Sequence, residues 1–230
     1  MNSSSKENTV LVTGANRGIG LELTRQLLQR GWHVIAVCRS HSQELADLEA
    51  EGIVEVFDGV DVSSEDDVTG LARRLEGRKL HWLVNNAGIL ERDSLETLDF
   101  ASIERQFRVN TLGPLRVAAA LRGLMGEGSK IFVITSAMGS ISDNTSGGYY
   151  GYRISKAAVN MAFKSLSVDL RDHGIGVFKL HPGYVATDMT AGQGDVTPEQ
   201  SAAGLIQRME ELELTDTGAF RHARGHDLEW

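Results

Sequence analysis

The chain has 230 residues, of which 41% are hydrophobic and 23% are charged. This length allows one large domain or two small ones, and the composition excludes an intrinsically disordered chain. The 23 Lys and Arg residues are outnumbered by 31 Asp and Glu, giving a formal net charge of −8 with no basic cluster, so we expect no nucleic-acid partner.

Short β-branched segments alternate with longer segments that carry apolar residues at helical spacing. The expected strands are residues 9–12, 33–37, 53–57, 81–84, 130–135 and 176–180, with a short strand near 219–221. The expected helices are residues 19–30, 43–50, 66–76, 102–124, 152–173 and 197 to about 211. This alternation, with strands that are apolar nearly throughout, predicts an α/β fold: a doubly wound parallel sheet of the Rossmann type, with about seven strands and helices on both faces.

The first expected strand runs into the sequence TGANRGIG and then directly into a helix. Glycines in such a turn let the backbone approach a pyrophosphate, whose charge is met by N–H groups and the helix dipole. A Walker-type phosphate loop is excluded because no Gly-Lys-Ser/Thr follows, although glycines also serve plain strand-to-helix turns. The residues of this turn expected to bind a dinucleotide are Gly14, Asn16, Arg17, Gly18, Ile19 and Gly20.

The end of the second expected strand indicates which dinucleotide binds. A carboxylate about 20 residues past the glycines binds the ribose hydroxyls of NAD, whereas an arginine there accommodates the 2′-phosphate of NADP. Here the strand ends in Arg39, no acid appears before Glu44, and Arg17 adds a second guanidinium. NADP(H) is therefore favoured over NAD, the alternative being that both arginines are solvated surface residues.

Further motifs follow in chain order: Asp61-Val62, NNAG at 85–88, Asn110, Thr135-Ser136, Tyr152-x-x-x-Lys156 and PGYVAT at 182–187. With TGANRGIG, they resemble the short-chain dehydrogenase/reductase family over nearly the whole chain. Residues 139–160 and Trp230 resemble, within that family, the C-factor and sniffer-type carbonyl reductases. The resemblance implies further cofactor contacts from Asp61, Val62, Asn86, Ala87, Gly88, Tyr152, Lys156, Pro182, Gly183, Val185 and Thr187.

Carbonyl reduction needs a hydride, which the cofactor supplies, and a proton donor at the substrate oxygen. Tyr152 suits the second role, but a free phenol has a pKa near ~10 and needs assistance at neutral pH. Lys156 lies four residues on, on the same helix face, and we expect its charge to lower the pKa of Tyr152. Neither Tyr149 nor Tyr150 has a lysine at that spacing.

Two further residues complete the expected catalytic set. Ser136 can donate a hydrogen bond to the substrate oxygen. It precedes Tyr152 by 16 residues, more than is common in the family, so Ser140 is the alternative. The resemblance implies that Asn110 joins Ser136, Tyr152 and Lys156 in a tetrad, where it bends its helix or binds water in a proton relay to Lys156.

Other kinds of site are disfavoured. His222 and His226 have metal-ligand spacing, but no third ligand is evident, so we expect a solvated tail and no metal site. A serine hydrolase would need a G-x-S-x-G elbow. An epimerase or dehydratase would need ~50 to 100 more residues of substrate domain.

The sequence therefore predicts an NADP(H)-dependent oxidoreductase that interconverts a small carbonyl compound and its alcohol, with a cofactor-binding signalling protein of C-factor type as the alternative. We expect a homodimer, because helices 102–124 and 152–173 are apolar on more than one face and the family pairs the matching helices. The single cysteine, Cys38, and the lack of an apolar leader or span predict a cytoplasmic protein without membrane association. Residues 1–8 are expected to form a flexible tail before a single domain at 9–230.

Overall fold

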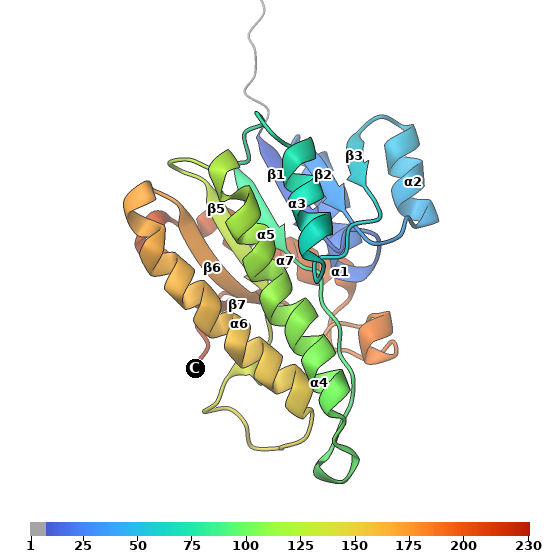
Figure 1. Cartoon of the computed structure of the whole chain (residues 1–230), viewed down its shortest axis with the longest axis vertical. Coiled ribbons are helices and arrows are strands. Elements are labelled where there is room, and N and C mark those ends of the chain that lie inside the picture. The colour runs from blue at the N-terminus through green and yellow to red at the C-terminus, as the bar shows by residue number, and fades with distance from the viewer. Residues whose placement is uncertain (1–7) are drawn as a thin grey trace, which may run out of the picture.

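The computed structural model describes residues 8–230, so most of the expected N-terminal tail lies outside the described residues. A parallel sheet of seven strands forms the centre of the molecule, in the order β3-β2-β1-β4-β5-β6-β7 (Figure 1). The doubly wound Rossmann-type fold predicted from the sequence is confirmed. Among residues 8–230, no helix has both the length and the apolar character that a membrane crossing requires.

The strands and helices follow the expected order along the chain. The strands are β1 Thr9–Thr13, β2 His33–Val37, β3 Val54–Phe57, β4 Trp82–Asn85, β5 Lys130–Ile134, β6 Gly176–His181 and β7 Phe220–His222. The α-helices are α1 Gly18–Gln29, α2 Gln43–Ala50, α3 Glu65–Arg74, α4 Phe100–Phe107, α5 Gly113–Leu121, α6 Tyr150–Asp169 and α7 Pro198–Glu211.

The sheet separates two hydrophobic cores. Successive side chains of a strand point to opposite faces, so on β1 Val10 and Val12 enter one core while Leu11 enters the other. Helices α1 and α7 cover the first core, and α3, α5 and α6 cover the second (Figure 1). Burial on both faces explains why the strands read as continuous apolar runs.

The position of β1 decides where a ligand can bind. It lies between β2 and β4, so the chain passes to one side of β1 first and to the other side afterwards. In sheets of this kind the connections diverge at such a reversal and leave a crevice at the carboxyl ends of the strands. This strand order therefore predicts a ligand site beyond the carboxyl ends of β1 and β4.

The helix predicted at 102–124 is interrupted in the structure. Helix α4 ends at Phe107, a π-helical segment spans Arg108–Leu112, and α5 follows from Gly113. The centre of the π-helical segment is Asn110, which the sequence had placed in mid-helix. Apolar spacing alone does not reveal this change, because the pattern continues through both parts of the helix.

The C-terminal residues are packed on the sheet. The ring of Trp230 lies 5.3 Å from that of Phe220 in β7, and the Lys179 Nζ lies 5.0 Å from the Trp230 ring centre. His222 lies within β7, with its ring 4.5 Å from that of His226. The interpretation of a solvated tail was therefore wrong for His222, because the seventh strand pairs it with β6, whereas His226 is exposed as expected.

Candidate active site

A cleft of about 560 Å³ opens at the carboxyl ends of the strands. Its walls come from the segments that follow β1, β2, β3, β4 and β6, namely residues 14–20, 37–40, 60–62, 86–89 and 186–189. This is the position that the strand order predicts for a ligand.

Most residues expected to bind a dinucleotide line this cleft. They are Gly14, Asn16, Arg17, Gly18, Ile19, Gly20, Arg39, Asp61, Val62, Asn86, Ala87, Gly88 and Thr187. Five expected residues are not in the lining: Tyr152, Lys156, Pro182, Gly183 and Val185. The lining also contains ten residues that sequence reasoning did not assign to the site: Val37, Cys38, Ser40, Val60, Ile89, Val109, Ala186, Asp188, Met189 and Pro198. All but Val37, Met189 and Pro198 adjoin a predicted site residue.

The glycine turn packs closely against the end of β4. A Cβ at Gly14 would lie 2.9 Å from the Ala87 Cα, and a Cβ at Gly20 would lie 2.0 Å from the Gly14 carbonyl oxygen. Helix α1 begins beside this turn without a side-chain cap and without an acidic residue in its first turn. The positive end of its dipole is therefore not neutralised locally, which fits the binding of a pyrophosphate.

Asn86 holds the glycine turn in place. Its Nδ2 donates to the carbonyl oxygens of Thr13 and Gly14, at 3.1 Å each, and the Thr13 hydroxyl oxygen accepts from the amides of Asn86 and Ala87. These bonds join the carboxyl ends of the two central strands. The floor of the cleft is thereby formed before any ligand binds.

Two ion pairs stand at the cleft, and each involves an arginine predicted from the sequence. The Arg17 Nη1 lies 3.3 Å from the Asp188 Oδ2, and the Arg39 Nη1 lies 3.8 Å from the Asp61 Oδ2. Both arginine side chains are more than half exposed, at 66% and 62%. Exposed pairs of this kind are weak, so either guanidinium is available to an incoming phosphate.

Tyr152, Lys156 and Ser136 come together beside the cleft, and all three are buried. The Ser136 hydroxyl accepts from the Met138 amide at 3.1 Å and is close enough to the phenol to lower the pKa of Tyr152. The Lys156 Nζ donates to the Ile134 carbonyl oxygen at 2.9 Å and lies 5.6 Å from the centre of the Tyr152 ring. A Cβ on Gly88, in the cleft wall, would lie 3.8 Å from that Nζ.

Burial acts in opposite directions on the pKa values of Tyr152 and Lys156. It raises the pKa of Tyr152 to about 12, against a smaller opposing effect of the Ser136 hydrogen bond. It lowers the pKa of Lys156 to about 8. The expected lowering of the Tyr152 pKa by Lys156 is not seen in this structure, because desolvation dominates and the ammonium group is bonded to Ile134.

The geometry favours Ser136 over Ser140 as the partner of Tyr152. The Ser140 hydroxyl lies 3.2 Å from the Ser142 hydroxyl and accepts from the Asp143 amide at 3.3 Å. Its polar contacts therefore stay within its own loop, whereas Ser136 is close enough to the phenol to lower the pKa of Tyr152.

Asn110 is buried and bonded to two other parts of the chain. Its Oδ1 accepts from the Ile89 amide, and its Nδ2 donates to the Ile89 carbonyl, both at 2.8 Å. The same Nδ2 donates to the Ser155 hydroxyl at 3.0 Å. The side-chain amide of Asn110 thus joins Ile89, in the cleft wall, to Ser155, which lies between Tyr152 and Lys156 on helix α6.

The family model for short chain dehydrogenases matches residues 8–197. The chain is 47% identical to 1-hydroxy-2-glutathionyl-2-methyl-3-butene dehydrogenase of Rhodococcus sp. strain AD45, over 97% of this chain and 100% of that protein. It is 39% identical to the C-signal protein of Myxococcus xanthus, over 64% of this chain and 91% of that protein.

Two solved structures are similar over nearly the whole chain. The carbonyl reductase sniffer of D. melanogaster has a TM-score of 0.91 at 33% identity, covering 97% of this chain and all of that one, 100%. An NADPH-bound carbonyl reductase from chicken fatty liver has a TM-score of 0.89 at 31% identity, covering 97% of this chain and 99% of that one.

The buried ammonium of Lys156 leads to a prediction about stability. Because its folded pKa of about 8 lies below the ordinary 10.5, the folded state disfavours the charge, and that cost is fully present at pH 7. We expect Lys156→Met to raise the free energy of unfolding at pH 7 by about 1–3 kcal/mol. The advantage should shrink as the pH rises from about 8 towards 10.5, where wild type loses the penalty.

Denaturant unfolding at pH 7 and pH 9.5 measures this difference. Lys79→Met is the matched control, because Lys79 is exposed. The control should change stability by less than about 0.5 kcal/mol at either pH. A Lys156→Met protein less stable than wild type at pH 7 would show that the bond to Ile134 outweighs desolvation.

Proposed function

The chain belongs to the short-chain dehydrogenase family, among its C-signal and sniffer-type members, and we propose that it is an NADP(H)-dependent oxidoreductase that interconverts a carbonyl compound and its alcohol. The observation that carries this proposal is the buried Tyr152, close to both Ser136 and Lys156, at the edge of a cleft suited to a dinucleotide. The solved carbonyl reductases of the same fold support the choice of substrate.

In this proposal, side chains of the protein donate the proton that the substrate oxygen receives, and the tyrosine is then reprotonated. Because burial holds the pKa of Tyr152 at about 12, the phenol is protonated at neutral pH and ready to donate to a substrate oxygen. Ser136 is placed to orient that oxygen. Lys156, whose pKa of about 8 is close to physiological pH, stabilises the phenolate left behind and returns a proton. Bound NADPH supplies the hydride.

Two features of the cleft support NADP(H). The uncapped start of α1 suits the pyrophosphate, and Arg17 and Arg39 supply guanidiniums for a 2′-phosphate. The chicken enzyme of the same fold has NADPH bound. The start of helix α1 would hold the pyrophosphate and Arg39 would bind the 2′-phosphate, and Gly88 leaves the cleft wall beside Lys156 free of a side chain.

The 47% identity to a dehydrogenase of a glutathionylated alcohol favours a second candidate, the oxidation of a thioether-bearing alcohol. Both candidates use the same residues, because carbonyl reduction and alcohol oxidation are the two directions of one reaction. The likeness to C-signal keeps a cofactor-binding signalling role as a further alternative. The grouping of Tyr152, Ser136 and Lys156 favours an enzyme, because a protein that only binds has no need of a proton donor.

We propose a cytoplasmic location, supported by the free thiol of Cys38. Burial, together with the nearby charges of Asp58 and Glu49, raises the pKa of that thiol to about 11. The thiol is therefore protonated and unreactive at neutral pH, which is typical of a structural cysteine in a reducing compartment.

The proposed chemistry is tested by cofactor turnover. Wild type should oxidise NADPH with members of a panel of aldehydes, ketones and quinones, and NADP⁺ with glutathionyl alcohols measures the opposite direction. Tyr152→Phe should lower kcat by at least about 100-fold, because it removes the general acid, while the NADPH Kd stays within about 2-fold. Tyr150→Phe is the control and should retain wild-type kcat. Full activity in Tyr152→Phe would contradict the assigned role.

Coenzyme choice is tested at Arg39. Arg39→Gln removes a charge that a 2′-phosphate needs, so we expect the kcat/KM preference for NADPH over NADH to fall by about 10-fold. The effect should weaken in high salt, because Arg39 is more than half exposed. Arg122→Gln, at another exposed site, should leave the preference unchanged. Equal kcat/KM for the two coenzymes in wild type would contradict the assignment of Arg39.

We also propose a homodimer formed through α6. Ile154, Met161 and Val168 are 48%, 67% and 64% exposed and, at seven-residue spacing, form one apolar stripe on that helix. Sedimentation at micromolar concentration should give a dimer, and Met161→Glu should give a monomer. Ile53→Glu, on an exposed apolar residue before β3, is the control. A monomeric wild type would contradict this proposal.

A further inference from the structure

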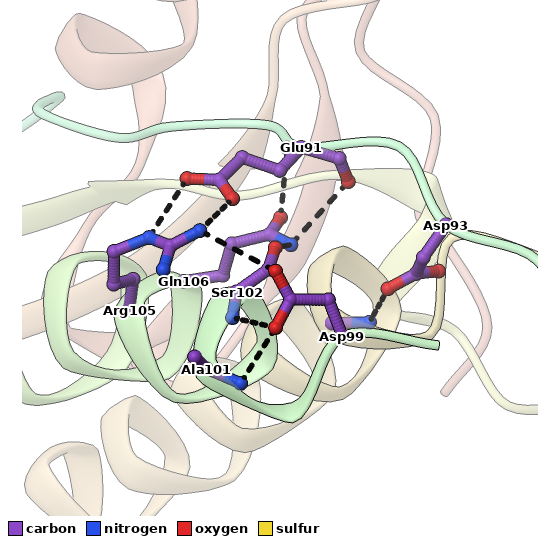
Figure 2. A network of polar contacts seen from close by, with 8 residues as sticks. Glu91, Asp93, Asp99, Ala101, Ser102, Arg105 and Gln106 are labelled. Atoms are coloured by element: carbon purple, nitrogen blue, oxygen red, sulfur yellow. Dashed lines mark hydrogen bonds and ion pairs between the residues drawn. The ribbon is translucent and has the colours of Figure 1, made fainter. Parts of the chain in front are cut away.

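The segment after β4 is held by two side-chain amides from the helix beside it. Asn110 bonds both the amide and the carbonyl of Ile89. Four residues earlier, the Gln106 Oε1 accepts from the Glu91 amide at 3.1 Å and its Nε2 donates to the Glu91 carbonyl at 3.3 Å (Figure 2). Ile89 and Glu91, two residues apart on the segment, thus bond side chains that lie one helical turn apart.

The next alternate residue, Asp93, reaches helix α6. Its carboxylate accepts hydrogen bonds from the amides of Tyr150 and Gly151, the latter at 3.0 Å, and its carbonyl accepts from the Tyr149 amide at 2.9 Å. Three consecutive amides at the start of α6 therefore bond to one residue. Asp93 is 9% exposed, so these bonds are shielded from water.

The start of α6 has no cap of its own. Tyr149, the residue before the helix, has a φ of 51° in the left-handed region and no capping side-chain bond. Uncapped amides at a buried helix end are costly. Asp93 therefore supplies from a distant segment the cap that local sequence lacks, and its negative charge also complements the helix dipole.

Gly151 lets the same helix end pack directly on Gln106. A Cβ at Gly151 would lie 2.6 Å from the Gln106 Nε2 and 3.1 Å from the Ile103 Cα. Tyr152 is the next residue. The first turn of α6 is thus held by Asp93 on one side and by α4 on the other, one residue before the proposed proton donor.

We propose that Asp93 is a positioning residue for Tyr152: by fixing the first turn of α6, it keeps the phenol buried and opposite Ser136. The catalytic part of this assignment rests on the proposed function. A displacement of about 1 Å at a reacting group can cost about 100-fold in rate, so a loosened first turn should affect turnover much more than cofactor binding.

Asp99 provides a matched comparison within the same network. Its Oδ1 caps α4 by accepting from the amides of Ala101 and Ser102, at 3.0 and 3.2 Å (Figure 2). Asp99 also caps the start of a helix with its carboxylate, but it directly precedes its own helix, its side chain is 59% exposed, and its helix end does not carry Tyr152. A purely structural role of Asp93 should therefore lower the Tm without a separate loss of kcat.

The test compares Asp93→Ala and Asp93→Asn with Asp99→Ala and Asp99→Asn. Asp93→Ala should lower kcat by about 10- to 100-fold with the NADPH Kd within about 2-fold. Asp93→Asn, which keeps one oxygen acceptor, should give an intermediate loss. Both Asp99 variants, which lose a helix cap away from Tyr152, should keep kcat within about 2-fold. Equal kcat losses at the two positions, or wild-type kcat in Asp93→Ala, would overturn the proposal.

Labelling of Tyr152 gives a readout that does not depend on activity. Nitration by tetranitromethane, followed by peptide mass spectrometry, should be slow for Tyr152 in wild type and several-fold faster in Asp93→Ala, with the exposed Tyr184 as internal reference. The Asp99 variants should nitrate Tyr152 at the wild-type rate. Unchanged nitration in Asp93→Ala would overturn the positioning role. A wild type without turnover but with this nitration pattern would contradict the proposed function alone.

Discussion

The arrangement of the site depends on one buried amide, the side chain of Asn110. A buried amide must satisfy both its donors and its acceptor, and Asn110 does so with Ile89 and Ser155. These partners lie on the segment after β4 and on α6, so this side chain links the cleft wall directly to the helix that carries Tyr152. The helix around Asn110 is π-helical, a local distortion that often occurs at functional sites.

Burial sets the pKa values of the two titratable side chains of the site, Tyr152 and Lys156. The same removal from water favours the neutral form of both Tyr152 and Lys156, and so moves their pKa values in opposite directions. The tyrosine keeps its proton firmly, while the lysine exchanges its proton near physiological pH. A protonated phenol beside a lysine with a pKa of about 8 is arranged for donation followed by reprotonation.

The two ends of the site are built differently. Around Tyr152 and Lys156 the polar groups are buried and bonded in several directions, so they are held rigidly. At the other end, Arg17 and Arg39 are exposed and paired singly with Asp188 and Asp61. Such pairs contribute little stability, so a phosphate can replace the carboxylates at small cost. A rigid reaction end and an adaptable binding end suit an enzyme that must position one group and release another.

The sequence by itself determined the features that depend on local spacing. Alternating strand and helix patterns predicted the sheet, the glycine turn predicted the cleft at the end of β1, and the four-residue spacing selected Tyr152 and Lys156 over the neighbouring tyrosines. Only the tertiary structure decided the π-helical break at Asn110, the raised pKa of Tyr152, and the cap that Asp93 supplies from 57 residues away. Periodicity is a property of neighbouring residues and can be read along the chain. Desolvation and long-range hydrogen bonds depend on which elements pack together, and no single segment contains that information.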